Sequence, residues 1–561
     1  MFFSRKKNLS RKDIEPDEIL MDSANLPGFE RGLFEGRLES PLPSKAPYVI
    51  LAVFFLGLFG IIFRLFELEI TRGEEYLARA ESNRLLRVRL PAERGLIYDR
   101  NMKELAWNAD DGRRYPYERG FGHVLGYLGY ADEFIPEVSA EVKIGKAGIE
   151  NVFDEVLRGR DGSRLIEEDA KGEFFAESVE LAPENGRSAV LTIDAGIQSE
   201  LFKIIENVAA DRGFKAGAGA AIDVKSGEIM ALVSAPEYDS NVLSKGGVSE
   251  KISGYIKDES NPFFFRAIDG LYPPGSTFKT VVALAALAEK IIDPEKQILS
   301  MGSISIPNPY FPDKPSVFYD WKAHGWVDMR RAIAVSSNVY FYTVGGGFGE
   351  QAGLGVKRII DYASRLGFGK KTGLELGGAE GFLPTPEWKE KNVPSDPVWR
   401  IGDTYNLSIG QGMLQVSPLQ MALLASTIAN EGLKPSPHLL KSLLFANGTK
   451  ETAEIKEPER ADVPEAVFKI VKEGMREAAE TGTASSLAGV GVKAAGKTGT
   501  AEIGSGTKVN SWFIGFFPYD DPKVALAIVL EGGRAENLVG APYAASRIVR
   551  WIAQNRPELI R

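Results

Sequence analysis

The chain has 561 residues, with 67 Lys and Arg against 76 Asp and Glu, and a formal net charge of −9. Apolar residues make up 44% and charged residues 25%, a globular balance that excludes a wholly disordered chain. The acidic balance argues against a nucleic-acid binder that depends on bulk positive charge. The absence of cysteine excludes disulfides, thiolate metal sites, iron–sulfur clusters and a cysteine nucleophile.

Histidine is scarce, since His123, His324 and His438 are the three in the chain. This argues against a metal site built from two or three histidines, and a Ser-His-Asp triad would need one of them. At roughly 150 residues per domain, the length predicts about three to four domains.

Residues 46–63 form an uncharged stretch of 18 residues, APYVILAVFFLGLFGIIF. At ~1.5 Å per residue this helix would span about 27 Å, close to a bilayer core. Because the stretch is apolar on every face and no small-residue cleavage site follows, we expect a retained signal-anchor over 46–66 and not a buried core helix. Five Lys and Arg between positions 5 and 12 favour a cytoplasmic N-terminus.

Between residues 67 and 189 the sequence predicts short strands and turns rich in Gly, Arg and Glu, with no long apolar helix. From about residue 190 the sequence pattern changes from short strands and turns to longer elements. Ile193–Ala209 is expected to form a helix with Asp194 as its N-cap. The expected divisions are a polar tail at 1–45, the anchor helix at 46–66, a mainly β domain at 67–189 and a larger domain at 190–561.

Two expected hairpins lie at the two ends of the larger domain. Their strands are Gly217–Val224 with Glu228–Val233, and Ser511–Phe517 with Val524–Leu530. A closing helix is expected at Tyr543–Gln554, and the segments between the hairpins are mostly helical. This order predicts an α+β domain in which one antiparallel sheet unites both hairpins and helices pack on it.

The first candidate catalytic element is Tyr272-Pro273-Pro274-Gly275-Ser276-Thr277-Phe278-Lys279. The uncharged run Thr280–Ala288 predicts a helix whose N-terminus lies at Ser276, with Lys279 three residues later on the same face. A helix N-terminus favours an alkoxide and an oxyanion, and a buried Lys of lowered pKa acts as a base. The simpler alternative is that Ser276 only caps the helix.

Ser-x-x-Lys occurs three times, so the motif alone is weak. Ser4–Lys7 lies in the tail, and Ser505–Lys508 lies in a Gly-rich turn with no helix after it. Only Ser276 has the expected helical context.

The second candidate element is Ser336-Ser337-Asn338, before the aromatic run Val339–Tyr342. The Ser336 hydroxyl and the Asn338 amide on one short loop can relay a proton and bind a peptide amide. Helix capping is the simpler alternative.

The third candidate element is Lys497-Thr498-Gly499-Thr500, which small residues precede and a strong strand follows. This favours an edge strand on which Gly499 permits close approach of a substrate. Lys497 and the Thr hydroxyls would bind a carboxylate, and the Thr500 N–H would be an oxyanion donor. A second Lys-Thr-Gly at Lys371–Gly373 lacks this context.

Ser-x-x-Lys, Ser-x-Asn and Lys-Thr-Gly in this order, behind one membrane anchor, resemble the penicillin-binding proteins. The resemblance runs from residue 46 to the C-terminus. Arg94–Asn101, Gly148–Glu150 and Leu157–Gly159 resemble the pedestal of class B members. Segments that resemble the elongation type, penicillin-binding protein 2, are Trp321–Gly325, Glu387–Lys389, Asp403–Gly412 and Ser417–Gln420.

The resemblance implies a transpeptidase domain of the penicillin-binding and serine β-lactamase-like fold, with an antiparallel sheet, helices and a helical subdomain. One transmembrane helix and a mainly β pedestal (67–189) would precede it, without a glycosyltransferase domain. Only 14 residues separate Asn108 from His123, where relatives carry a longer insertion that forms the pedestal head. This puts activation through a head-binding partner in doubt. Asn338 also stands where the family often has Asp.

The resemblance further implies that Ser276 attacks the penultimate D-Ala of a peptidoglycan stem peptide while Lys279 takes its proton. Ser336, between Lys279 and Lys497, would help to pass the proton to the departing D-Ala. An amine of a neighbouring stem would then resolve the acyl-enzyme.

The remaining groups would bind the substrate. Lys497, Thr498 and Thr500 would hold the terminal carboxylate, Asn338 would position the donor peptide, and the N–H groups of Ser276 and Thr500 would hold the oxyanion. No metal or organic cofactor is implied. His324 lies in a family-like segment, either packed in its loop or in contact with the substrate.

The implied partners are stem peptides of nascent peptidoglycan, β-lactams that acylate Ser276, the membrane, a polytopic glycosyltransferase of the SEDS type and elongation-complex proteins, but no nucleic acid. The implied location is the bacterial cytoplasmic membrane, with the catalytic domain on the outer side.

Four alternatives stay open. A serine β-lactamase or a membrane-bound β-lactam sensor would share the acylated Ser, but the pedestal segments argue against both. A non-catalytic scaffold of the wall-synthesis complex would not need three intact motifs. A division-type transpeptidase is the fourth alternative, and in this sequence only the segments around Trp388 and Gln411 favour the elongation type over it.

Overall fold

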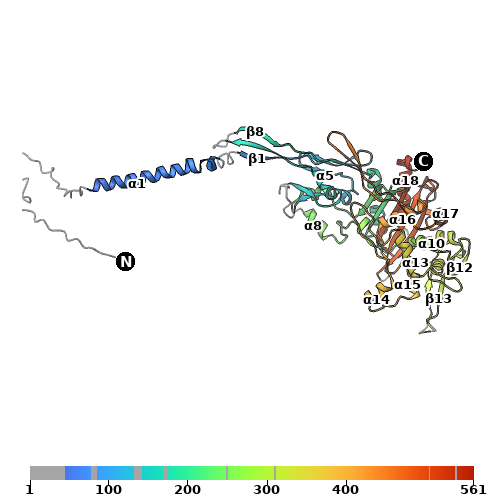
Figure 1. Cartoon of the computed structure of the whole chain (residues 1–561). Helices are drawn as coiled ribbons and strands as arrows, with labels where there is room; N and C mark the ends of the chain where they lie inside the picture. The colour runs from blue at the N-terminus through green and yellow to red at the C-terminus, as the bar shows by residue number, and fades with distance from the viewer. Residues whose placement is uncertain are drawn as a thin grey trace, which may run out of the picture. The chain divides into compact units, whose positions relative to one another are not determined.

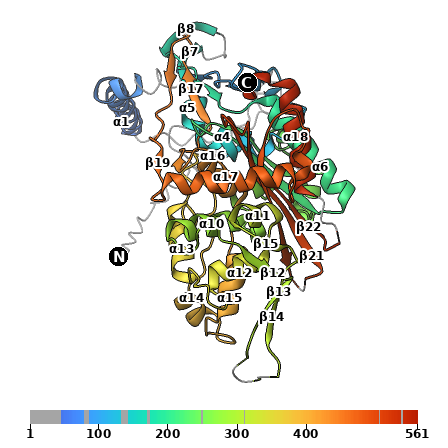
Figure 2. The same cartoon turned by 90° about the vertical axis from the view of Figure 1, so that its right-hand side faces the viewer.

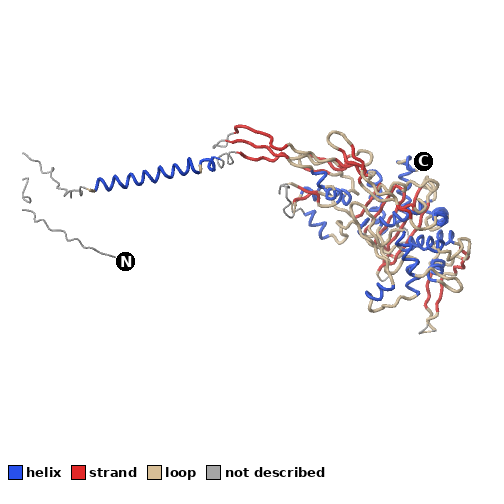
Figure 3. Tube along the Cα trace, viewed as in Figure 1, coloured by secondary structure: helices blue, strands red, loops and turns tan. Residues whose placement is uncertain are grey.

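The computed structural model describes residues 45–77, 85–131, 142–168, 174–247, 250–308, 311, 313–504, 506–536 and 540–561. The chain forms two compact units. One contains residues up to Leu86 together with Leu165–Glu177, and the other contains Arg87–Arg164 and Ser178–Arg561. Figure 3 distinguishes the helices and strands of both units.

The first unit contains the apolar helix α1 (Ala46–Phe66), which continues as the π-helical turn η3 (Glu67–Thr71) (Figure 1). Together they form 26 residues with a mean hydropathy of 2.6 over their most apolar window, and none of that window is buried. By length and composition this helix can cross a membrane. The expected anchor helix over 46–66 is therefore confirmed as a helix, and residues 1–44 of the expected tail lie outside the described residues.

Short strands and single-turn helices characterise the region between the anchor and residue 190, as the sequence predicts. A three-stranded sheet has the order β1-β7-β8, and β5 pairs with β6. The elements are β1 (Leu85–Leu90), β2 (Ile97–Tyr98), β3 (Glu104–Ala109), β4 (Gly112–Arg114), α3 (Gly122–Leu125), β5 (Leu128–Tyr130), β6 (Lys143–Gly145), α4 (Gly148–Val152), α5 (Asp154–Arg158), β7 (Gly162–Glu168), β8 (Phe174–Leu181) and β9 (Ser188–Leu191).

A six-stranded sheet of order β18-β17-β9-β2-β3-β4 crosses the expected domain boundary. Its strands β17 (Leu440–Leu444) and β18 (Lys450–Thr452) come from the C-terminal half of the chain. Strand β17 pairs antiparallel with β9, which pairs parallel with β2. The sequence did not predict this pairing.

The large sheet unites the two predicted hairpins. Its order is β11-β10-β22-β21-β20, and every neighbouring pair is antiparallel. The strands are β10 (Ala216–Asp223), β11 (Ile229–Ala235), β20 (Ala495–Ile503), β21 (Lys508–Phe517) and β22 (Val524–Arg534). The predicted α+β class is confirmed, and β20, which carries the Lys-Thr-Gly motif, is an edge strand.

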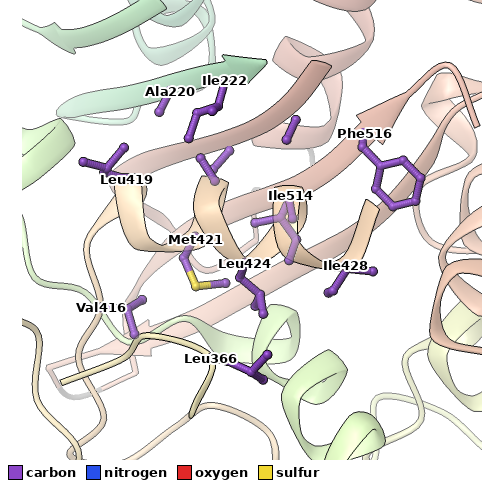
Figure 4. Packing of buried hydrophobic residues seen from close by; sticks show 14 of the residues in the cluster. Ala220, Ile222, Leu366, Val416, Leu419, Met421, Leu424, Ile428, Ile514 and Phe516 are labelled. Atoms are coloured by element: carbon purple, nitrogen blue, oxygen red, sulfur yellow. The ribbon is translucent and has the colours of Figure 1, made fainter. Parts of the chain in front are cut away.

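Helices cover both faces of this sheet (Figure 2). Helices α6 (Ala195–Arg212) and α18 (Ala541–Asn555) pack on one face, and α16 (Pro418–Ala429) packs on the other. Because strand side chains alternate, Phe513 of β21 joins the α6–α18 core whereas Ile514 joins the α16 core. Figure 4 shows this second core, with the apolar side of α16 against the sheet.

A mainly helical region lies between the two hairpins in the sequence. It contains α10 (Lys279–Ala288), whose residues 279–287 are all buried. Its other elements are α7 (Ser240–Lys245), α8 (Glu250–Lys257), α9 (Arg266–Asp269), η4 (Gly275–Phe278), β12 (Ile298–Ser300), β13 (Ser303–Ile306), β14 (Ser316–Tyr319), β15 (Gly325–Val327), α11 (Met329–Val335), α12 (Asn338–Gly346), α13 (Val356–Arg365), α14 (Pro386–Asn392), α15 (Ile401–Ser408), β16 (Leu433–Lys434), β19 (Glu459–Arg460), α17 (Glu465–Glu480) and η5 (Ser485–Leu487). The short turn η6 (Pro557–Leu559) follows α18.

Asp194 links the start of α6 to the end of α18 through hydrogen bonds to both. Its Oδ1 accepts from the N–H groups of Gly196 (2.9 Å) and Ile197 (3.0 Å), as an N-cap does. The Arg556 guanidinium donates to both carboxylate oxygens at 2.8 Å. Burial opposes ionisation, but the bonds and charge of Arg556, together with the bonds from the Ile197 N–H and Asn101, outweigh it and hold the pKa of Asp194 below its usual value.

We predict that Asp194→Ala lowers the free energy of unfolding by about 3 kcal/mol, because a helix cap and a buried ion pair are lost together. Chemical denaturation of the detergent-solubilised protein would measure this. Asp211→Ala, at the exposed C-terminal end of the same helix, should change stability little. The contribution of Asp194 should persist down to about pH 4 and disappear only in stronger acid. An equal loss of unfolding free energy in Asp194→Ala and Asp211→Ala would contradict the prediction.

Candidate active site

Ser276 lies in the 3-10 turn η4, one turn ahead of the α-helix, whose first residue is Lys279. The two form one helical segment over Gly275–Ala288, so the predicted helix N-terminus at Ser276 is confirmed, with a first turn that is 3-10 and not α. In 3-10 geometry, residues three apart eclipse one another, so Ser276 and Lys279 are on the same side of the turn. The Trp512 indole N–H of β21 donates to the Pro273 carbonyl (3.0 Å) and fixes the turn to the sheet.

Two glycines allow this turn to lie directly against β20. Gly275 has a φ of +55°, and a Cβ there would lie 2.5 Å from the Thr500 carbonyl oxygen. A Cβ on Gly499 would lie 2.8 Å from the Pro274 carbonyl oxygen. Both distances are shorter than a carbon atom allows, so glycine is required at both positions. The close neighbour of Gly499 is thus the turn that carries Ser276.

Lys279 is completely buried. Its Nζ donates to the Ser336 carbonyl oxygen (2.8 Å) and to Asn338 Oδ1 (2.7 Å), and it lies 3.2 Å from Ser336 Oγ. None of these three bonds goes to Ser276. Burial lowers the pKa of Lys279 to about 7, against the opposing attraction of Asp320.

The Ser-Ser-Asn segment forms the tight connection between α11 and α12. Ser336 ends α11 in the left-handed conformation, with a φ of +59°. Ser337 is the N-cap of α12 and accepts from the Tyr340 N–H (3.3 Å). The capping role therefore belongs to the middle residue, and Ser336 and Asn338 are left to face Lys279.

Lys497 is the second completely buried lysine of the site. Its Nζ donates to the carbonyl of its neighbour Thr498 (2.9 Å), and the Thr498 hydroxyl donates to Thr483 Oγ1 (2.8 Å). Burial, with a smaller contribution from Lys279, lowers the pKa of Lys497 well below its usual value. The Ser336 hydroxyl is bonded to Lys279, and no bond joins it to Lys497 among these described residues, so only one half of the expected Lys279–Ser336–Lys497 relay is in contact.

These elements line one cleft of about 1170 Å³. Of the predicted residues, it contains Ser276, Ser336, Asn338, Thr498, Gly499 and Thr500. The two buried lysines lie behind its wall. Its charged lining residues are Glu502 and Glu531, and Glu531 is neutralised by the buried Arg266 (3.0 Å). Among the residues that the structure describes, no group of three His, Asp or Glu side chains is arranged to hold a metal ion.

Asp320 is the residue at this site that the sequence analysis missed. It follows β14, and its side chain is fully buried behind the Ser336–Asn338 connection. An isolated acid between two aromatic residues, Tyr319 and Trp321, was the available signal. His324 packs edge-on against Trp321 (ring centroids 5.0 Å apart) and lies 3.6 Å from Asp320, so it is packed in its loop. Burial lowers the pKa of His324.

The additional copies of the motifs lie elsewhere. Ser4 and Ser505 fall outside the described residues. Lys371–Gly373 lies in a loop after α13 and does not line the cleft.

Comparisons with known proteins agree with this geometry. The family model described as "Penicillin binding protein transpeptidase domain" matches residues 217–550, and "Penicillin-binding Protein dimerisation domain" matches residues 102–191. The peptidoglycan D,D-transpeptidase MrdA of Haemophilus influenzae is 28% identical over 618 aligned residues, which cover 90% of this chain and 92% of its own.

Two solved structures are also similar. Penicillin-binding protein 2 of Pseudomonas aeruginosa, in complex with WCK 5153, is 31% identical with a TM-score of 0.68 and covers 83% of this chain and 96% of its own. A chain of a peptidoglycan synthase complex that coordinates polymerisation and crosslinking is 28% identical with a TM-score of 0.70, over 91% of this chain and 98% of its own.

The transpeptidase match alone spans more than half of the chain, and the dimerisation match precedes it in the order of class B proteins. The chain therefore belongs to the penicillin-binding protein transpeptidases, as a class B member of the penicillin-binding protein 2 type.

Proposed function

We propose that this chain is the elongation-type peptidoglycan D,D-transpeptidase of its cell, and that Ser276 is its nucleophile. The activity follows from the family. The observation that supports the residue assignment is Lys279, a completely buried amine one 3-10 turn after Ser276, held by Ser336 and Asn338. A buried lysine of lowered pKa is a base at neutral pH, and here it lies beside a half-buried serine at the wall of a large cleft.

The proposed reaction has two steps. Lys279 accepts the proton of Ser276 Oγ, which attacks the carbonyl carbon of the penultimate D-Ala of a stem peptide. The peptide C–N bond breaks, and Ser336 helps to return the proton to the amine of the departing D-Ala. An amine of a neighbouring stem then attacks the acyl-enzyme ester and forms the cross-link, which releases Ser276.

Edge strand β20 would hold the substrate. The backbone N–H groups of Ser276 and Thr500 form the proposed oxyanion hole, since the turn of Ser276 lies against the Thr500 backbone. Lys497, Thr498 and Thr500 bind the terminal carboxylate, whose negative charge favours the protonated form of Lys497. Gly499 keeps the strand close to the turn, and Asn338 positions the donor peptide.

The proposed organisation follows from the helix α1. Residues 46–66 anchor the chain in the bacterial cytoplasmic membrane, 1–45 lie in the cytoplasm, 67–189 form the pedestal and 190–561 form the catalytic domain on the outer side. The similar chain of a peptidoglycan synthase complex supports wall-synthesis partners, among which we place a SEDS-type glycosyltransferase and the other elongation proteins. β-Lactams would acylate Ser276 as substrate mimics.

We predict that a fluorescent penicillin labels the membrane-extracted protein for many minutes, and that Ser276→Ala abolishes the labelling. Ser505→Ala, in another Ser-x-x-Lys, should label as the wild type does. Release of the label within seconds would indicate a β-lactamase. Labelling of the Ser276→Ala variant would refute the assignment of the nucleophile.

We predict that the second-order rate constant of acylation rises with pH through about 7 and then levels off, because Lys279 must be neutral to accept the proton. Lys279→Arg should lower this rate constant by more than about 1000-fold, since a guanidinium cannot serve as the base. Stopped-flow fluorescence between pH 5.5 and pH 8.5 (about 1.5 units either side of neutrality) would measure the profile. A flat profile would show that another group is the base.

We predict that Gly499→Ala lowers the acylation rate constant by about 100-fold, because its Cβ displaces the Ser276 turn from β20. Gly254→Ala is the matched control, since a Cβ there meets nothing within 4 Å and lies in the short helix α8. Labelling kinetics and the melting temperature should be measured for both. A Gly499→Ala variant with wild-type kinetics would show that the close contact does not matter.

A further inference from the structure

The carboxylate of Asp320 joins three segments behind the cleft. Its Oδ2 accepts from Ser337 Oγ (2.8 Å), the Val339 N–H (3.0 Å) and Ser300 Oγ of β12 (3.2 Å). Its Oδ1 accepts from the N–H of Trp321 (2.9 Å). The side chain has no solvent-exposed surface, and a buried carboxylate with four donors is a fully satisfied acceptor.

Two of these contacts, from Ser337 and Val339, place the negative charge at the N-terminus of α12. Ser337 is the N-cap of this nine-residue helix, and Val339 is its second residue, whose backbone N–H donates to Asp320 Oδ2. The N-terminus of a helix carries partial positive charge and unpaired N–H groups, so an anion stabilises it there. Ser337 caps the helix through its own side chain and is itself held by Asp320.

The same connection carries every acceptor that holds Lys279. These acceptors are the carbonyl and hydroxyl oxygens of Ser336 and the Oδ1 of Asn338. The Asn338 amide also donates to the carbonyl of Tyr319 (3.2 Å), the residue before Asp320. The side chain of Asn338 is thus held between Lys279 and the segment that carries Asp320.

The charge of Asp320 also acts on the lysine. The titratable groups that face Lys279 are Asp320 after β14, Lys497 on β20 and His324 in the loop after Asp320. Asp320 raises the pKa of Lys279 against the effect of burial. The Phe341 ring of α12, 5.6 Å from Nζ, completes the surroundings.

We propose that Asp320 is a positioning residue of the transpeptidase reaction, whose carboxylate holds the Ser336–Asn338 connection so that Lys279 is directed at Ser276. The inference rests on the proposed roles of Ser276 and Lys279. Asp320 does not touch the substrate; it acts through the N-terminus of α12 and through Asn338.

The first test is Asp320→Asn in the full-length, detergent-solubilised protein, with penicillin acylation as the readout. Asparagine keeps the shape but replaces one acceptor oxygen by a donor and removes the charge. The first-order acylation constant should fall by about 10- to 100-fold, with little change in the concentration of half-saturation. The midpoint of the pH profile should also move to lower pH, because the attraction of Asp320 for the protonated lysine is lost.

Asp328→Asn is the matched control. Asp328 caps the neighbouring helix α11 and accepts from the Arg331 N–H (2.8 Å), away from Lys279. Its substitution removes a carboxylate charge from a helix N-terminus but keeps an acceptor for the cap, and it does not touch the Ser336–Asn338 connection, so the acylation constant and the pH midpoint should stay at the wild-type values.

Ser337→Ala separates position from charge and serves if Asp320→Asn does not fold. It deletes the bond from Ser337 Oγ to Asp320 and the side-chain cap of α12, but keeps the carboxylate and its bond from Val339, so the first-order constant should fall by about 10-fold with an unchanged pH midpoint. Wild-type acylation kinetics in either variant would overturn the inference, as would an equal loss in Asp328→Asn. A wild-type protein that does not label at Ser276 would instead refute the proposed function.

Discussion

The site depends on the complete burial of Lys279 at the start of α10. An amine without access to water must find acceptors in the protein, and a carbonyl, a hydroxyl and an amide oxygen from the connection between α11 and α12 provide them. This requirement brings together the turn of Ser276 and the Ser336–Asn338 connection, about 60 residues apart in the sequence. The same burial lowers the pKa of Lys279 to about 7. The burial of Lys279 therefore accounts both for the joining of the two segments and for the lowered pKa of the amine.

The sheet provides the third part of the site through its topology. Both terminal hairpins contribute to it, and β20 is left at an edge, where its outward backbone groups are free of a neighbouring strand. Small residues at Gly275 and Gly499 bring that edge against the nucleophile turn. An internal strand could not offer backbone donors to a peptide substrate, because a neighbouring strand would already occupy them.

Much of this was accessible from the sequence, for reasons that can be stated. Two nearly continuous apolar runs predicted β21 and β22, Asp194 marked the start of α6, and the motif order identified the family. The sequence could not show which residue of Ser-Ser-Asn caps a helix, because that depends on the left-handed conformation of Ser336. Asp320 was missed because its partners, Ser300 and Val339 among them, lie about 20 residues away in the sequence. No local pattern links Asp320 to them. The pairing of β17 with β9 was missed for the same reason.

The shared sheet of order β18-β17-β9-β2-β3-β4 has a practical consequence for dissecting the molecule. Strand β9 ends at Leu191, at the expected start of the catalytic domain, and its two neighbours come from opposite halves of the chain. A fragment that begins at about residue 190 would lose β9 and leave β17 with an unpaired edge. Such an edge pairs readily with other chains, so the shortened protein would aggregate. A soluble fragment should begin before β2 and keep the whole sheet, even though this means retaining much of the region that precedes the catalytic sequence motifs.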